Sequence, residues 1–76
     1  MSIETIVEAA KAKIAEMGGG EQYLGVTSEL AETCNVDPDE VFFWIADLGE
    51  AMEKAGLKLV VNKANSTKLY AGPKEG

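Results

Sequence analysis

Asp37-Pro38-Asp39-Glu40 is the strongest local signal in the sequence, because it combines several features of a helix start. Asp37 suits the N-cap, Pro38 suits the first helical position, and Glu40 can reach back as the third residue of a capping box. Apolar residues then recur at steps of three and four, which predicts a helix that begins at Pro38. Gly56 is expected to end this helix by adopting the left-handed backbone conformation. The side chains predicted to be buried by this helix are Val41, Trp44, Ile45, Leu48, Met52 and Ala55.

The chain before this helix is divided by Gly18-Gly19-Gly20. Apolar residues fall on one helical face from Ile3 to Met17, and Ser2 is suited to cap that first helix. The glycines end it, since they allow left-handed backbone and offer no side chain to pack. The segment 23–26 is predicted to form one brief strand, followed by a second helix that Thr27 caps and that runs to about residue 34.

Two β-prone runs follow the third helix, at 57–62 and 67–71. The short polar stretch between them predicts a β-hairpin. Residues 72–76 are expected to form a flexible tail. We find no internal repeat and no linker, so residues 1–76 are predicted to form a single domain.

The composition limits both the stabilisation and the chemistry of the chain. It has 76 residues, one cysteine and no histidine, so an internal disulfide or a Cys/His zinc site is not available. There is no histidine base, no arginine clamp and no nucleophile beside a base, so we expect no enzyme, catalytic residue, metal or cofactor. Without a signal-like start or an apolar run of membrane-spanning length, we expect a cytoplasmic protein with no membrane partner.

Charge is divided unevenly along the sequence. The net charge is −6, which argues against broad affinity for nucleic acids. Residues 1–53 hold twelve carboxylates and two lysines, a net charge of −10, whereas residues 54–76 hold five lysines and one glutamate, a net charge of +4. The cations are therefore concentrated in the predicted hairpin and tail.

The order of helix, helix, short turn, helix and hairpin resembles the winged helix-turn-helix family over residues 2–72. The stretches that carry the resemblance are 26–32, 35–41 and 55–57. The resemblance implies an α+β fold, a winged helix with three helices packed on a small antiparallel sheet and a C-terminal β-hairpin wing. In that family the third helix enters the major groove of DNA, and the wing lies against the backbone or the minor groove.

The third helix departs from this pattern in its chemistry. Its outward positions carry carboxylates and large aromatic side chains, and arginine is absent from the chain. Because carboxylates repel phosphates, we expect the helix to serve a protein-interaction or regulatory accessory module instead of reading bases. The predicted partner-binding residues are Asp39, Glu40, Phe42, Phe43 and Asp47.

The two adjacent phenylalanines cannot both be buried by one helix face, so at least one is expected to be exposed. In one interpretation Phe42 packs under the wing or the first helix, while Phe43 is half covered by long side chains. In the other, Phe43, with or without Phe42, anchors a protein partner within an acidic rim.

The alternative function is a small DNA-binding regulator that contacts the DNA backbone through the wing. The residues suited to that contact are Lys58, Lys63, Asn65, Ser66 and Lys68. Lysines on an exposed hairpin also protect a sheet edge from pairing with other chains, which is a purely structural explanation. The sequence leaves open whether the protein is a monomer or a homodimer.

Overall fold

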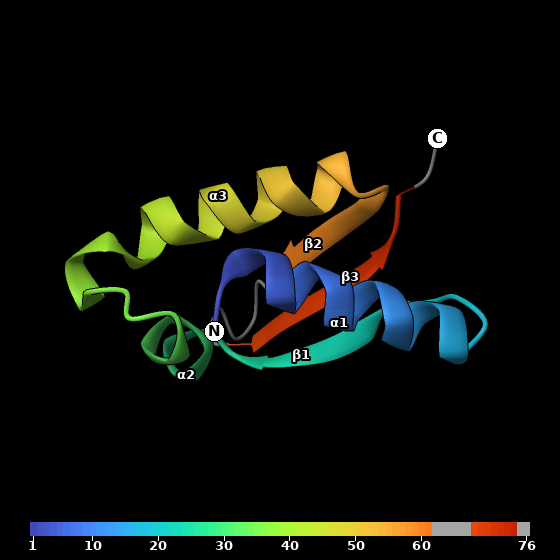
Figure 1. The fold of residues 1–76 in the computed structure, drawn as a ribbon, viewed down its shortest axis with the longest axis horizontal. Coiled ribbons are helices and arrows are strands. Elements are labelled where there is room, and N and C mark those ends of the chain that lie inside the picture. Colours follow the sequence, from blue (N-terminus) through green and yellow to red (C-terminus); the bar gives the residue numbers. More distant parts are fainter. Residues whose placement is uncertain (62–67, 75–76) are drawn as a thin grey trace.

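The computed structural model describes residues 1–61 and 68–74 of the chain. Three α-helices and a three-stranded antiparallel sheet make up the fold (Figure 1). The elements in chain order are α1 (Ile3–Glu16), β1 (Gln22–Val26), α2 (Thr27–Thr33), the 3₁₀ turn η1 (Pro38–Glu40), α3 (Val41–Lys54), β2 (Leu57–Val61) and β3 (Lys68–Pro73). This arrangement confirms the predicted α+β class, with three helices packed on a small antiparallel sheet.

The sheet has the strand order β1-β3-β2, with β3 in the centre. β3 pairs antiparallel with both neighbours, so the two C-terminal strands pair as the hairpin prediction requires. The predicted turn of that hairpin lies at 62–67, outside the described residues. The first strand enters between α1 and α2 and joins the sheet next to β3, with a bulge between Tyr23 and Gly25.

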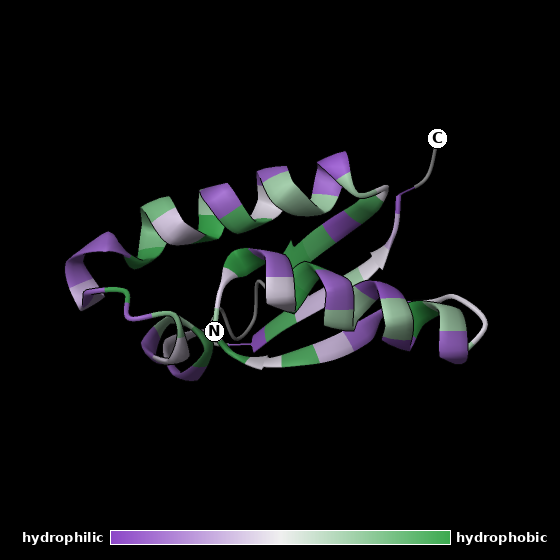
Figure 2. Ribbon diagram, viewed as in Figure 1, coloured by the Kyte–Doolittle hydropathy of each residue, from purple (hydrophilic) through white to green (hydrophobic). Residues whose placement is uncertain are grey.

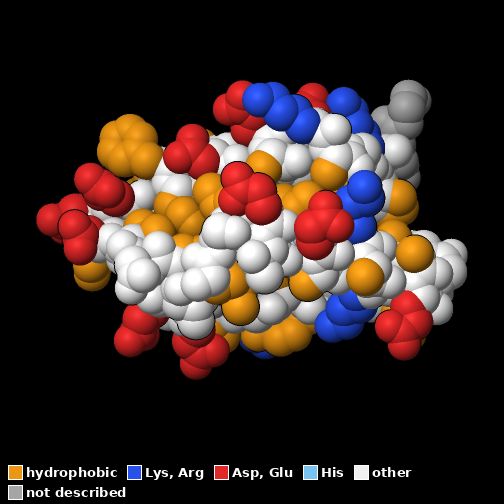
Figure 3. Space-filling model, viewed as in Figure 1, with side chains coloured by type: hydrophobic (Ala, Val, Ile, Leu, Met, Phe, Trp, Pro, Cys, Tyr) orange, Lys and Arg blue, Asp and Glu red, His pale blue; other side chains and the backbone are white. Residues whose placement is uncertain are grey.

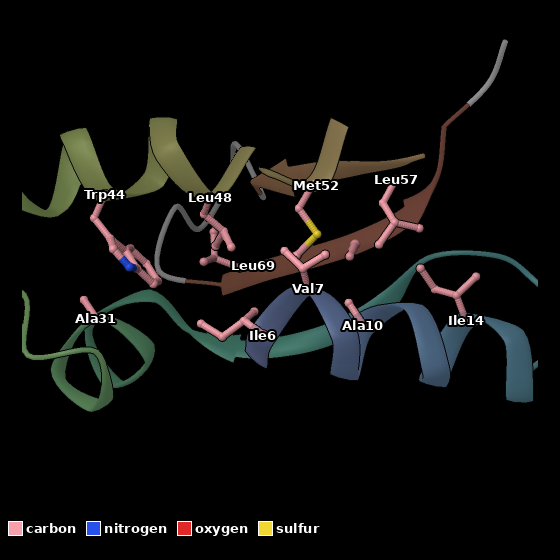
Figure 4. Packing of buried hydrophobic residues seen from close by; sticks show 11 residues of the cluster. Ile6, Val7, Ala10, Ile14, Ala31, Trp44, Leu48, Met52, Leu57 and Leu69 are labelled. Carbon is pink, nitrogen blue, oxygen red and sulfur yellow. The ribbon is translucent and has the colours of Figure 1, made fainter. Parts of the chain in front are cut away.

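Helices α1 and α3 lie against one another and against the same face of the sheet, and each turns its apolar side inward (Figure 2). The core takes Ile6, Val7, Ala10 and Ile14 from α1, Ala31 from α2, Trp44, Leu48 and Met52 from α3, and Leu57, Leu69 and Ala71 from the sheet (Figure 4). Full burial of each large apolar side chain contributes about 1.5–3 kcal/mol, and Leu48, Met52 and Leu69 are fully buried. The core thus fixes α3 along β2.

The helix ends show which local signals act as predicted. The Ser2 hydroxyl accepts a hydrogen bond from the Thr5 N–H at 3.3 Å, which confirms Ser2 as the first N-cap. Gly56 has a φ of +81°, which confirms its left-handed conformation after α3. Thr27, in contrast, is already the first residue of α2 and is buried, because the chain passes directly from β1 into the helix with Val26 at the N-cap.

The start of the third helix differs from its prediction in detail. Asp37 is the N-cap of η1 and Pro38 is its first residue, as predicted, but the Asp37 side chain makes no capping hydrogen bond within the described chain. The predicted capping box is therefore wrong. Residues 38–40 form a 3₁₀ turn instead, which places Glu40 at the N-cap of α3 and one residue before its first turn.

The predicted flexible tail is wrong for residues 72–74. Gly72 is buried, Pro73 pairs with Leu57, and the Lys74 N–H donates to the Gly56 carbonyl at 3.0 Å. Non-local pairing with β2 extends the last strand to Pro73, although residues at a chain end are often poorly ordered. Residues 75–76 lie outside the described chain.

Candidate protein-interaction surface

The N-terminal end of α3 extends past the sheet, at the end of the molecule that also holds α2 (Figure 1). Pro38 begins the turn η1, whose 3₁₀ geometry leads without interruption into α3. Trp44 then fixes the first turn of α3 in the core, with 6% of its surface exposed. We call the surface formed here by Asp39, Glu40, Phe42, Phe43 and Asp47 the acidic tip.

Both phenylalanines of the acidic tip point into solvent. Phe42 is 86% exposed and Phe43 is 74% exposed. The interpretation in which Phe42 packs under the wing or the first helix, with Phe43 half covered, is therefore wrong. The core takes the adjacent Trp44 instead, and consecutive residues on a helix differ in direction by about 100°, so neither phenylalanine can follow it inward.

The two rings leave α3 on different sides. Phe42 lies on the side that carries Gly49 two turns later, and Gly49 packs beside Leu59 of β2. Phe43 lies on the side of Asp47, which lines an open groove of about 480 Å³ between α3 and the start of α1. A partner that contacts both rings therefore has to enclose the exposed side of the helix, where Ala46 lies between them.

Asp39, Glu40 and Asp47 are exposed and take part in no ion pair among the described residues. The three ion pairs that the structure shows lie elsewhere: Glu50–Lys54 at 3.3 Å, Glu53–Lys74 at 3.2 Å and Glu21–Lys58 at 3.8 Å. Apolar side chains are exposed among carboxylates at this end of the molecule (Figure 3). The acidic tip is therefore a negatively charged surface with two exposed rings.

These carboxylates also have a structural role. Asp39 and Glu40 precede the N-terminus of α3, where the helix macrodipole presents partial positive charge. Negative side chains there stabilise a helix by about 0.3–1 kcal/mol each. This accounts for acidic residues at the helix start, but it does not account for the two exposed phenylalanines.

Of the predicted DNA-contact residues, the structure places only Lys58 and Lys68. Lys58 crosses Gly72 to reach Glu21, with its Nζ 3.8 Å from the Glu21 carboxylate oxygen, so its charge is partly neutralised. Lys68 is exposed at the start of β3 and pairs there with Val26 of β1. Lys63, Asn65 and Ser66 lie outside the described residues.

Sequence reasoning missed some residues of the surface around Phe43. Ile3 and Glu4 of α1 line the groove beside Asp47, together with Glu50, Ala51 and Lys54. Ala46 could have been found from the sequence, because it follows Phe42 by four residues and Phe43 by three. The contribution of α1 could not, since it depends on how α1 packs against α3.

Over 1–61 and 68–74, no cluster of three or more metal-binding side chains occurs. Among the helices of the described segments, none is long and apolar enough to cross a membrane. No family model, curated protein or solved structure shows a significant match to this chain. The winged-helix resemblance thus rests on the order of elements and on the apolar spacing.

Proposed function

We propose that this chain is a non-enzymatic, cytoplasmic winged-helix protein that acts as an accessory module and binds another protein through its acidic tip. The observation that carries the proposal is the exposure of Phe42 and Phe43, at 86% and 74%, beside three carboxylates without ion-pair partners among the described residues. Large aromatic side chains surrounded by polar residues are typical of the centre of a protein interface.

The size of the expected effect follows from the two rings. Burying one phenylalanine against a partner contributes about 1.5–3 kcal/mol, and every 1.4 kcal/mol is a tenfold change in affinity. Loss of either ring is therefore expected to weaken binding about 10- to 100-fold. The carboxylates favour a partner with lysines or arginines around an apolar depression, since opposite charge speeds the encounter.

Site-specific crosslinking tests this proposal directly. A photoreactive benzoylphenylalanine placed at Phe43 should crosslink to a discrete partner in an extract of the source cells, whereas the same group at exposed Glu8 of α1 should not. For the partner so identified, Phe42→Ala and Phe43→Ala should each weaken binding. Met17→Ala is a matched control, because Met17 is also a large apolar residue and is 63% exposed, but lies at the far end of α1.

Two results would contradict the proposal. Equal crosslinking from positions 43 and 8 would mean that the contact is not specific to the acidic tip. Equal affinities of the Phe43→Ala and Met17→Ala proteins would mean that the ring does not anchor the partner.

The alternative function is DNA binding through the wing, and the exposure of Lys68 without an ion pair in the described chain favours it. Lys68→Glu should then abolish a gel shift measured with duplex DNA at low salt and reduce the dependence of binding on salt. A gel shift that survives Lys68→Glu would argue against this contact. The acidic tip opposes the usual docking of the third helix, because it would face phosphates.

A further inference from the structure

We propose that the outer edge of β2 accepts an extended peptide segment of a partner protein as an added strand, antiparallel to β2. The strand order β1-β3-β2 places β2 at one edge of the sheet, and its only strand partner in the described chain is β3. An open edge presents backbone N–H and C=O groups with which another chain can pair. This site does not require that the phenylalanines of the acidic tip bind anything.

The pairing between β2 and β3 shows which backbone groups remain for a further strand. The Lys74 N–H donates to the Gly56 carbonyl at 3.0 Å, and the register of β2 and β3 continues from that pair. Because bonded and non-bonded pairs alternate along an antiparallel ladder, every second residue counted from Gly56 bonds to β3. The residues between them, Leu57, Leu59 and Val61, therefore direct their N–H and C=O groups to the open edge.

An open groove of about 420 Å³ lies between α3 and β2, lined by Gly49, Glu53, Leu57, Lys58, Leu59 and Lys74. α3 runs along β2 here (Figure 4). Gly49 has no side chain to fill this space, and the side chain of Leu59 borders it. A strand added at the edge would turn alternate side chains toward α3, so a fitting segment has apolar residues at every second position.

Charge sets the direction of the added strand. α3 runs opposite to β2, since Gly49 packs beside Leu59 while Glu53 pairs with Lys74 at the Gly56 end. Asp39 and Glu40 of the acidic tip therefore lie beyond the Val61 end. Phe42 precedes Gly49 by seven residues, which is about 10 Å along a helix, so a strand of about seven residues reaches from the groove to the tip.

An antiparallel segment would begin near the acidic tip and end near Lys58 and Lys74. The complementary peptide therefore has lysine or arginine at its start, alternating apolar residues in its middle and a carboxylate at its end. Lys58 already pairs with Glu21, and Lys74 already pairs with Glu53. The unpaired carboxylates of the tip therefore contribute most of this preference.

The test is a titration of ¹⁵N-labelled protein with the peptide acetyl-Lys-Arg-Val-Thr-Val-Thr-Val-Thr-Glu, followed by amide hydrogen exchange. At a peptide concentration of about 100 Kd, exchange at the amides of Leu57, Leu59 and Val61 should slow by about 100-fold, because only free protein exchanges. The valines would lie opposite Leu57, Leu59 and Val61, whose backbone groups point to the open edge. Their side chains would face the groove and their N–H groups would bond to β2. N-methylation of the valines should abolish binding, whereas N-methylation of the threonines should leave it.

A peptide of the same composition with its charged ends exchanged serves as a matched control and should bind more weakly. Equal effects of both N-methylated peptides would overturn the proposal, and so would an absence of binding. Shift changes confined to Phe42 and Phe43 would also overturn it, while leaving the acidic tip as a binding surface. Slow exchange at the three edge amides without peptide, together with a dimer mass in sedimentation, would show that a second copy occupies the edge instead.

Discussion

Gly49 of α3 lies directly against Leu59 of β2: a β-carbon built on Gly49 would be 3.8 Å from Leu59 Cδ2. That separation is ordinary van der Waals contact, so a methyl group fits without displacing β2. The glycine therefore leaves the helix less stable than it could be, at the point where α3 borders the open edge of the sheet.

Gly49→Ala should stabilise the fold by about 0.5–1 kcal/mol, because glycine in a helix interior loses more backbone entropy on folding than alanine. The free energy of unfolding, measured with urea, checks this. Gly56→Ala is the matched control and should destabilise, since Gly56 has a φ of +81°. A destabilised Gly49→Ala protein would show that Leu59 cannot accommodate the methyl group.

Gly25→Ala should destabilise the fold by about 1–3 kcal/mol. Gly25 has a φ of +142°, which side chains rarely adopt, and its added β-carbon would lie 3.4 Å from Leu30 Cγ. The bulge between β1 and β3 thus depends on glycine. Thermal unfolding followed by circular dichroism measures the loss, and a midpoint equal to that of the natural chain would contradict this account of the bulge.

Leu48→Ala should lower the free energy of unfolding by about 2–5 kcal/mol, because Leu48 is fully buried and its removal leaves a cavity. Phe42→Ala and Phe43→Ala should change it by no more than about 0.5 kcal/mol, since both rings are exposed. Urea unfolding followed by the emission of Trp44, the single tryptophan, gives all of these values. A large loss in either phenylalanine variant would mean that the ring packs in the folded state.

Trp44→Phe should change stability by no more than about 1 kcal/mol. The Trp44 Nε1–H is buried and has no hydrogen-bond acceptor among the described atoms, so replacing it removes a penalty of about 1–3 kcal/mol. The smaller ring leaves a void that offsets this gain. Circular dichroism during urea unfolding measures the net effect, and a loss as large as that of Leu48→Ala would reveal an acceptor for Nε1.

Asp39→Lys and Asp47→Lys should slow the association of the partner identified by crosslinking, at low salt more than at high salt. Glu8→Lys makes the same change of charge on α1, away from the acidic tip, and should have a smaller effect. Stopped-flow measurements at two salt concentrations compare the three variants. Identical association rates for Asp39→Lys and Glu8→Lys would show that only the overall charge matters.

The sequence predicted the fold where the signals are local and strong. Ser2 caps α1, Gly56 ends α3, and the apolar spacing of α3 identified Trp44, Leu48 and Met52 as buried. It failed where a choice depends on neighbours in space. The side-chain caps predicted at Thr27 and Asp37 are not formed. The chain passes directly from β1 into α2, and a 3₁₀ turn precedes α3.

The end of β3 shows the same limit more clearly. Pro73 has no backbone N–H to donate. It can nevertheless lie opposite Leu57, because this is a non-hydrogen-bonded pair of the antiparallel ladder. The sequence also left open whether Phe42 is buried or exposed, because a shift of one residue in the position of the buried helix face changes the answer. The residue types of the acidic tip are evident from the sequence, whereas the packing of Trp44 determines how they are displayed.

Ion pairing among the described residues differs between the two ends of α3, which gives this helix a difference in charge along its length. Lys54, Lys58 and Lys74 are each matched by a glutamate at the end where α3 finishes, while Asp39 and Glu40 remain unmatched where it starts. In the field of a positively charged surface, such a molecule is turned before it makes contact. The N-terminal end of α3 would approach that surface first. Orientation during diffusion therefore favours the phenylalanines as the first groups to contact it.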